Sequence, residues 1–166
     1  MSDVNRKLPT VAVALGLAGL IPFVAFGWWA STGINDDRVA RATSALVAYG
    51  AVILAFLGGV QWGFVLGEPP GAPGPRRTRY RLVFGIAPSL VGWAALLVLL
   101  VLGWPQIALA ILLAGFITET AAETELAMRG LMPRGYLWLR SGLSAVVIVV
   151  IGAVLVLRLL GVHLGS

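Results

Sequence analysis

The chain has 166 residues, of which 59% are hydrophobic and only 11% are charged, and its mean hydropathy is +0.95. This composition lies outside the range of soluble globular domains and is typical of multi-pass membrane proteins. The net charge of +5 indicates cytoplasmic loops beside anionic headgroups rather than a nucleic-acid partner, so nucleic-acid binding is not expected. No cysteine is present and His163 is the single histidine, so we expect no disulfide, no metal site and no cofactor.

Five apolar runs follow one another along the chain, each long enough for a membrane-spanning helix. The first run follows two basic residues like a signal peptide, but its apolar stretch is too long, so it is predicted to be a retained helix. We therefore predict an all-α fold, a single polytopic membrane bundle of five transmembrane helices. The predicted spans are residues 8–30, 44–66, 82–102, 106–126 and 139–160.

The connections between these runs carry their own signals. Asn35 or Asp36 is the predicted N-cap of a helix that begins ahead of the second apolar run. The connection at 103–105 is so short that the third and fourth helices must form a tight antiparallel hairpin. The longest connection, 67–81, is a Pro and Gly tract that is not expected to form a helix. It ends in four arginines that are expected to bind anionic headgroups: Arg76, Arg77, Arg79 and Arg81.

Basic residues are distributed unequally between the two predicted sides of the membrane. Nine fall within 6–7, 76–81 and 129–140, and three fall on the other side, at Arg38, Arg41 and Arg158. The positive-inside rule then predicts a cytoplasmic N-terminus and a C-terminus on the outer side. We expect the membrane to be a bacterial inner (cytoplasmic) membrane, in which the C-terminus would be periplasmic.

Small residues recur at every fourth position of the second apolar run, where two GxxxG units overlap. Inside lipid, close backbone approach and dispersion hold helices together, and small side chains permit such an approach. We predict that this stripe packs against another helix of the same chain, with a helix of another protein as the alternative. The stripe comprises Ala51, Ala55, Gly59, Gly63 and Gly67.

Three polar residues are predicted to lie within or at the edge of the hydrocarbon. Gln61 faces away from the small-residue stripe, and its amide needs partners there, either in an interhelical hydrogen bond or in a ligand or quinone. Glu119 and Glu123 share one helix face at i and i+4. Glu119 is the acid most deeply immersed, and it serves either as a proton carrier or counter-ion, or as a structural group that snorkels or pairs with an arginine such as Arg140.

No catalytic constellation is recognisable, so an enzyme is not expected. The first functional hypothesis is an accessory, structural or assembly subunit of a larger respiratory or photosynthetic membrane complex, in contact with other membrane subunits. The alternative is a small transporter or a quinone- or lipid-binding protein that uses Gln61 and Glu119.

Several stretches together resemble a known family. They are "LPTVAVALGLAGLIPF", "LVAYGAVILAFLGGVQWG", "APSLVGW" and "MPRGYLWLRSGLS", which are spread over nearly the whole chain. The chain is similar to the transmembrane protein 69 family, small proteins of bacterial inner membranes and mitochondria with a domain of unknown function. The resemblance implies a five-helix membrane protein and brings no established activity. The family usually carries histidine at the position of Gln61, and an acid at the inner end of the fourth helix, which Glu123 or Glu125 matches.

Overall fold

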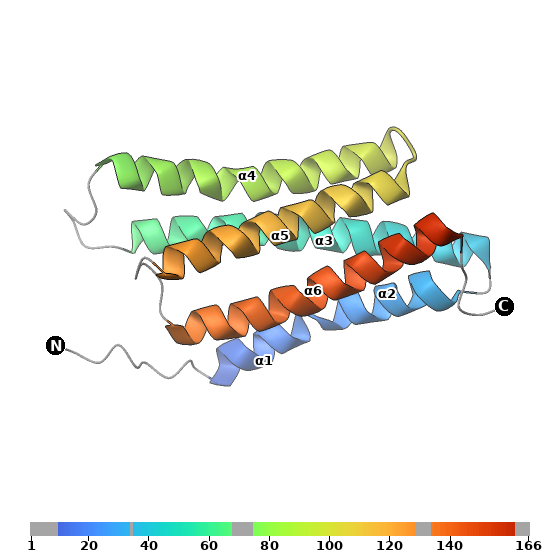
Figure 1. Cartoon of the computed structure of the whole chain (residues 1–166), viewed down its shortest axis with the longest axis horizontal. Coiled ribbons are helices and arrows are strands. Elements are labelled where there is room, and N and C mark those ends of the chain that lie inside the picture. The colour runs from blue at the N-terminus through green and yellow to red at the C-terminus, as the bar shows by residue number, and fades with distance from the viewer. Residues whose placement is uncertain (1–9, 34, 68–74, 129–133, 162–166) are drawn as a thin grey trace.

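The computed structural model describes residues 10–33, 35–67, 75–128 and 134–161, and every regular element within them is an α-helix. Figure 1 shows these helices running side by side along one axis, so that the bundle is elongated. The helices are α1 Thr10–Ala18, α2 Ile21–Thr32, α3 Asp36–Leu66, α4 Pro75–Leu100, α5 Pro105–Met128 and α6 Arg134–Leu160.

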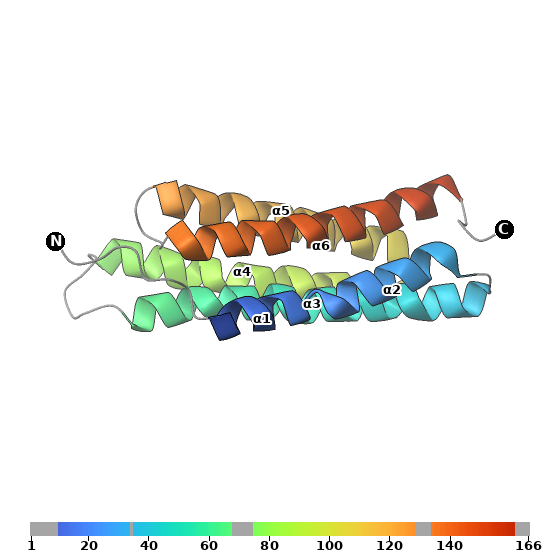
Figure 2. The ribbon, with the colours of Figure 1, turned by 90° about the horizontal axis from the view of Figure 1, so that it is seen from below.

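The helices form five segments that are long and apolar enough to cross a membrane, because α1 and α2 together make one span. In Figure 2, α5 and α6 lie together in one layer, and α4, α3 and the α1–α2 pair lie in the other. Within the second layer, α3 packs against α4 on one side and α2 on the other, while α5 lies over α3. The prediction of a five-helix all-α membrane bundle is confirmed.

The first span is broken between α1 and α2, directly before Pro22. Proline has no backbone N–H, so a continuous helix would leave a carbonyl without its donor at this depth. The backbone instead forms a tighter turn, in which the Leu20 amide donates to the carbonyl of Leu17, three residues earlier, at 3.0 Å. The hydroxyl of Tyr49, on α3, donates to the carbonyl of Gly19 at 3.0 Å and so satisfies one of the acceptors at the break.

The predicted connections are partly right. Asn35 caps α3 by accepting a hydrogen bond from the Asp37 amide at 3.1 Å, and α4 and α5 are joined by a short turn in which Gly103 has a φ of 68°. The prediction that all of 67–81 is non-helical is wrong, because α4 begins at Pro75. Proline is favoured in the first helical turn, where its missing N–H would have no partner in any case.

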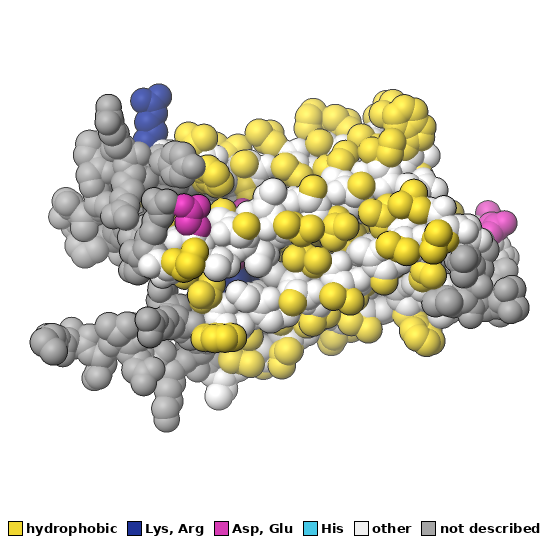
Figure 3. Space-filling model, in the orientation of Figure 1, with side chains coloured by type: hydrophobic (Ala, Val, Ile, Leu, Met, Phe, Trp, Pro, Cys, Tyr) yellow, Lys and Arg dark blue, Asp and Glu magenta, His cyan; other side chains and the backbone are white. Residues whose placement is uncertain are grey.

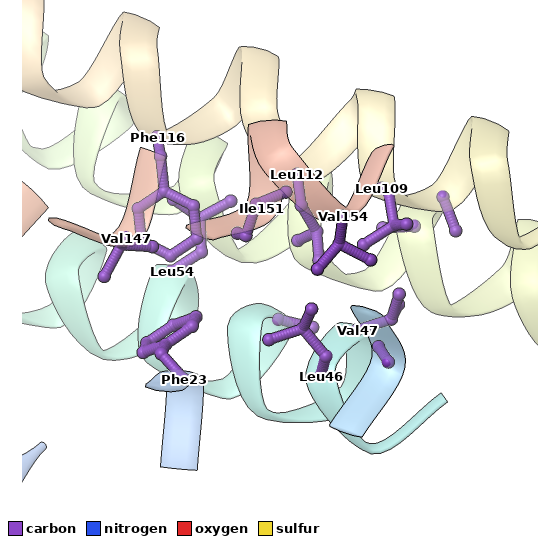
Figure 4. Packing of buried hydrophobic residues seen from close by; sticks show 14 of the residues in the cluster. Phe23, Leu46, Val47, Leu54, Leu109, Leu112, Phe116, Val147, Ile151 and Val154 are labelled. Carbon is purple, nitrogen blue, oxygen red and sulfur yellow. The ribbon is translucent and has the colours of Figure 1, made fainter. Parts of the chain in front are cut away.

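The apolar core lies between α2, α3, α5 and α6 (Figure 4). Phe23 of α2 packs against two other aromatic rings, with its ring centroid 5.0 Å from that of Tyr49 and 6.0 Å from that of Phe116, both in edge-on geometry. Leu54 of α3 and Leu112 of α5 are fully buried beside them. This core fixes the spacing of the two layers and therefore the positions of the polar residues that follow.

The closest helix contact, between α3 and α4, does not follow the predicted stripe. A Cβ added at Gly92 would lie 2.8 Å from the carbonyl oxygen of Ala51, and one added at Gly58 would overlap the carbonyl oxygen of Gly85. The two contacts lie seven residues apart on each helix, which is two helical turns. A seven-residue step returns to almost the same helix face, so both contacts belong to one seam.

The C-terminal part of the small-residue stripe, from Gly59 onward, does not belong to this seam. Four residues rotate the chain by about 400°, so a stripe of period four drifts about 40° around the helix at each step. Ala51 is therefore buried and Ala55 is half-buried, while Gly59, Gly63 and Gly67 are exposed. A Cβ at Gly59 or Gly63 would meet nothing within 4 Å. The prediction that all five residues pack against another helix of this chain is wrong beyond Ala55.

Candidate functional site

Five polar side chains from three helices are buried together near the end of the bundle where α4 begins. Gln61 comes from α3, Glu119 and Glu123 from α5, and Arg140 and Ser144 from α6. None of them is more than 9% exposed. We call these five residues the polar cluster.

The cluster contains one ion pair. The Nε atom of Arg140 lies 3.1 Å from each carboxylate oxygen of Glu123, with hydrogen-bond geometry to Oε1. The side-chain amide of Gln61, on α3, lies beside the carboxyl group of Glu119, on α5, close enough for the two groups to interact. Gln61 is therefore placed for an interhelical contact with Glu119, and the hydrogen bond that was one of its two predicted roles stays a prediction. Arg140 pairs with Glu123 rather than with Glu119, so Glu119 is the carboxyl group in the cluster without a hydrogen-bonded cation.

Helical periodicity explains why these residues meet. Glu119 and Glu123 on α5, and Arg140 and Ser144 on α6, are each spaced i and i+4, so each pair lies on one face of its helix. Gln61 lies on the face of α3 that also carries buried Leu57 and Val65, as its position opposite the exposed glycines requires. The snorkelling role for Glu119 is wrong, because its side chain is 6% exposed inside the bundle and not extended to the surface.

The cluster is only partly satisfied. Buried polar atoms normally have hydrogen-bond partners, since leaving one unpaired costs about 1–3 kcal/mol. Here five buried atoms have none, one from each residue of the cluster: Gln61 Oε1, Glu119 Oε1, Glu123 Oε2, Arg140 Nη2 and Ser144 Oγ. Three of these are acceptors and two can donate, so the cluster has unused capacity for a molecule that both gives and receives hydrogen bonds.

Two adjoining grooves reach the cluster from the side of the bundle, between α1, α3 and α6. The narrower, of about 170 Å³, is lined by both Arg140 and Ser144, together with apolar residues that include Phe23 and Phe116. The wider, of about 330 Å³, is lined by Arg140 and otherwise by apolar residues and a glycine. Both share Arg140 and Leu143, so they form one continuous path beside α1. A third hollow, of about 60 Å³ between α4 and α5, is lined by Glu119.

The surface around this path is apolar. In Figure 3, hydrophobic and uncharged side chains cover the length of the bundle, and charged groups lie at its two ends, apart from small specks of colour between the apolar side chains. Of the four arginines predicted to bind headgroups, only the Arg79 side chain lies within the described residues, and it is exposed at the start of α4. The side chains of Arg76, Arg77 and Arg81 lie outside them.

Sequence reasoning found Gln61, Glu119 and Glu123 and named Arg140 as a possible partner, but it missed Ser144. A serine in an apolar helix is ordinary, and only its i, i+4 spacing from Arg140 signalled a shared face. Among the described residues, no group of three or more His, Cys, Asp or Glu side chains is placed to hold a metal ion. The side chains of the polar cluster can form hydrogen bonds and ion pairs and can exchange protons.

Known proteins resemble this chain over much of its length. It is 45% identical over 94 residues to "Transmembrane protein 69" of Xenopus tropicalis and 40% identical over 90 residues to the mouse (Mus musculus) protein of the same name. These segments cover 55% and 54% of this chain, and 34% of each relative, so the chain matches about a third of the length of these proteins. No solved structure matches it.

The five apolar helices and these relatives together identify an integral, multi-pass membrane protein. The match to a family covers residues 8–156, which includes the whole polar cluster and both grooves. The chain therefore belongs to the family described as "Protein of unknown function (DUF3429)".

Proposed function

We propose that the chain is a non-enzymatic membrane protein that binds an amphipathic, lipid-phase molecule beside Arg140 and Ser144. One observation carries the proposal. Two buried donors without partners, Arg140 Nη2 and Ser144 Oγ, belong to residues that line the same groove on the side of the bundle.

The chemistry of the ligand follows from these donors. A guanidinium nitrogen and a hydroxyl call for an acceptor oxygen, and the guanidinium favours one that carries negative charge. A quinone carbonyl and the phosphate or ester oxygens of a phospholipid all meet this requirement. What they share is an acceptor oxygen at one end of a long hydrocarbon chain.

The wider groove is suited to the hydrocarbon chain of such a ligand. Apart from Arg140 its lining is apolar, with Ala12 and Leu15 from α1, Val60 from α3 and Leu139 from α6 among the contributors. Sites of this kind are mostly apolar with a few polar groups that fix orientation. A ligand would enter from the lipid, with no need to cross a headgroup layer.

Helix α1 forms the loosest wall of this path. It has nine residues, none of them buried, and it is separated from α2 by the break at Gly19 and Leu20. Its described packing is chiefly against α6. Elements with few buried contacts open at low free energy, so movement of α1 supplies a means of entry.

Native mass spectrometry tests the proposal by measuring how much ligand stays bound to the purified protein. A long-chain benzoquinone is added in one arm of the experiment and a phospholipid in the other. Leu143 lines both grooves, so Leu143→Trp should reduce ligand occupancy about tenfold, the effect of losing about 1.4 kcal/mol of binding. Leu159→Trp makes the same chemical change at a site on α6 that is 67% exposed, and it should leave occupancy unchanged.

Ser144→Ala provides a second variant that adds no bulk. Removal of one donor should weaken binding about three- to tenfold, the effect of one ordinary hydrogen bond. The arm that shows binding identifies the ligand as quinone or phospholipid. Absence of binding in both arms, or equal binding by all variants, would overturn the proposal.

A second candidate is an accessory or assembly subunit of a larger inner-membrane complex, respiratory or photosynthetic. It is favoured by the exposed Gly59 and Gly63, where no described residue lies within 4 Å of an added Cβ. A helix of another subunit could approach the backbone closely at that point. Gly63→Leu should then release the protein from a large complex on native gels, while Val52→Leu, at a lipid-exposed site on α3, should not. Migration of the wild-type protein as a small species would refute this candidate.

A further inference from the structure

A separate groove, of about 630 Å³, lies at the opposite end of the bundle from the polar cluster. It runs along the hairpin formed by the end of α2 and the start of α3, which are antiparallel neighbours. We call it the hairpin groove. Its lining comes from two helical stripes, one with Phe26 and Trp29 on α2 and one with Arg38, Arg41 and Ala45 on α3.

The two arginines of the hairpin groove are available for a ligand. Arg38 and Arg41 are exposed, are spaced i and i+3, and have no ion pair with any acid in the part of the chain that the structure describes. By contrast, Arg140 pairs with Glu123, and Arg158 donates to the hydroxyl of Thr43 at 3.1 Å.

The nearby polar groups do not compete strongly for these guanidinium groups. The side-chain oxygen of Asn35 is already used in capping α3. Asp36 and Asp37 occupy the first turn of α3 but do not line the groove. Among the described residues, an anion in the groove would therefore face two cationic side chains and no carboxylate.

The rest of the groove is apolar and aromatic. Phe26 and Trp29 stack edge-on with ring centroids 6.1 Å apart and form one wall, and Ala42 and Ala45 lie on the other. Arg38 and Ala45 are seven residues apart, so the lining changes from cationic to apolar over about 10 Å along α3. Tryptophan is enriched at the depth of the headgroups, and Trp29 is 59% exposed at this end of the bundle.

We propose that the hairpin groove binds an anionic phospholipid, with its phosphate held by Arg38 and Arg41 and an acyl chain lying over Phe26 and Ala45. An acidic protein segment would match the charges equally well, but it would leave the apolar half of the groove without a complement. This site is independent of the groove beside Arg140, since the two share no lining residue.

Fluorescence quenching in nanodiscs tests the site, and the chain has no native cysteine to interfere. A fluorophore is attached at Thr32→Cys, in the hairpin groove, or at Leu102→Cys, a 50% exposed position in the α4–α5 turn at the same end of the bundle. Brominated phosphatidylglycerol is then compared with brominated phosphatidylcholine at equal mole fraction.

The anionic lipid should be enriched beside Thr32 and not beside Leu102. Each basic residue near a membrane surface contributes about fivefold to anionic-lipid binding, so two should give an enrichment of about 25-fold. The double variant Arg38→Gln, Arg41→Gln should abolish the enrichment, and the double lysine variant should retain most of it. Equal quenching by the two lipids at Thr32 in the wild-type protein, or enrichment that survives the double glutamine variant, would overturn the proposal.

Discussion

Alanine substitutions at three glycines should separate the α3–α4 seam from the exposed stripe on the same helix. At Gly58 a new Cβ would overlap the carbonyl oxygen of Gly85, backbone against backbone. At Gly92 it would lie 2.8 Å from the carbonyl oxygen and 3.2 Å from the Cα atom of Ala51. At Gly63 it would meet nothing within 4 Å. The chemical change is identical in each case.

The expected energies follow from these contacts. Each substitution gains about the same helix propensity, at most ~1 kcal/mol, so that gain cancels in the comparison. Overpacking a close contact costs about 1–3 kcal/mol, and rigid backbone cannot yield as a flexible side chain can. Gly58→Ala should therefore destabilise the protein by about 3 kcal/mol relative to Gly63→Ala, and Gly92→Ala by about 1 kcal/mol.

Reversible unfolding of the detergent-solubilised protein measures these differences in the free energy of unfolding. The protein is titrated with sodium dodecyl sulfate, and unfolding is followed by tryptophan fluorescence. The predicted order of stability is Gly63→Ala, then Gly92→Ala, then Gly58→Ala. If Gly63→Ala is as destabilising as Gly58→Ala, the close contact does not lie where the structure has it, and the reasoning on the period-four drift fails.

Three further predictions concern the polar cluster and the topology. Arg140→Met should destabilise the protein by about 3–5 kcal/mol in the same assay, because it leaves Glu123 buried without its cation, and replacing both residues by leucine should cost less than this single change. We predict that Gln61 donates a hydrogen bond to the neighbouring Glu119, so Gln61→Leu should cost about 1–2 kcal/mol, and a neutral result would show that this bond is not formed. Thr78→Cys should react with an impermeant thiol reagent only after intact cells are opened, since the positive-inside rule predicts this segment to be cytoplasmic. Labelling from outside would reverse the topology.

The number and order of the helices could be predicted from the sequence, because each helix is indicated by residues within its own segment. Apolar runs of about 20 residues predict spans whatever their neighbours are. The Asn35 cap needs only the following turn of its own helix. The error at 67–81 has the same local origin, since a tract rich in proline and glycine was read as uniformly non-helical although Pro75 is well suited to a first turn.

The polar cluster was accessible only in part. The i, i+4 spacing showed that Glu119 and Glu123 share a face, but not that α6 would bring Arg140 to Glu123 in place of Glu119. That choice depends on the relative heights of α5 and α6, which the core around Phe116 sets. The packing stripe failed for a related reason. The small residues showed where a close helix approach is possible, but not which face of α3 turns inward. In the structure that face carries Leu54, Leu57 and Gln61.

Photoaffinity labelling tests the central claim most directly. A diazirine-bearing quinone and a diazirine-bearing phospholipid are each equilibrated with the wild-type protein in membranes, irradiated, and the adducts are mapped by peptide mass spectrometry. The account predicts adducts from one probe concentrated on the α1 residues near Leu15 and the α6 residues around Leu143, and their loss in Leu143→Trp but not in Leu159→Trp. Adducts spread evenly over all lipid-facing helices, or unchanged by Leu143→Trp, would contradict a ligand site beside Arg140.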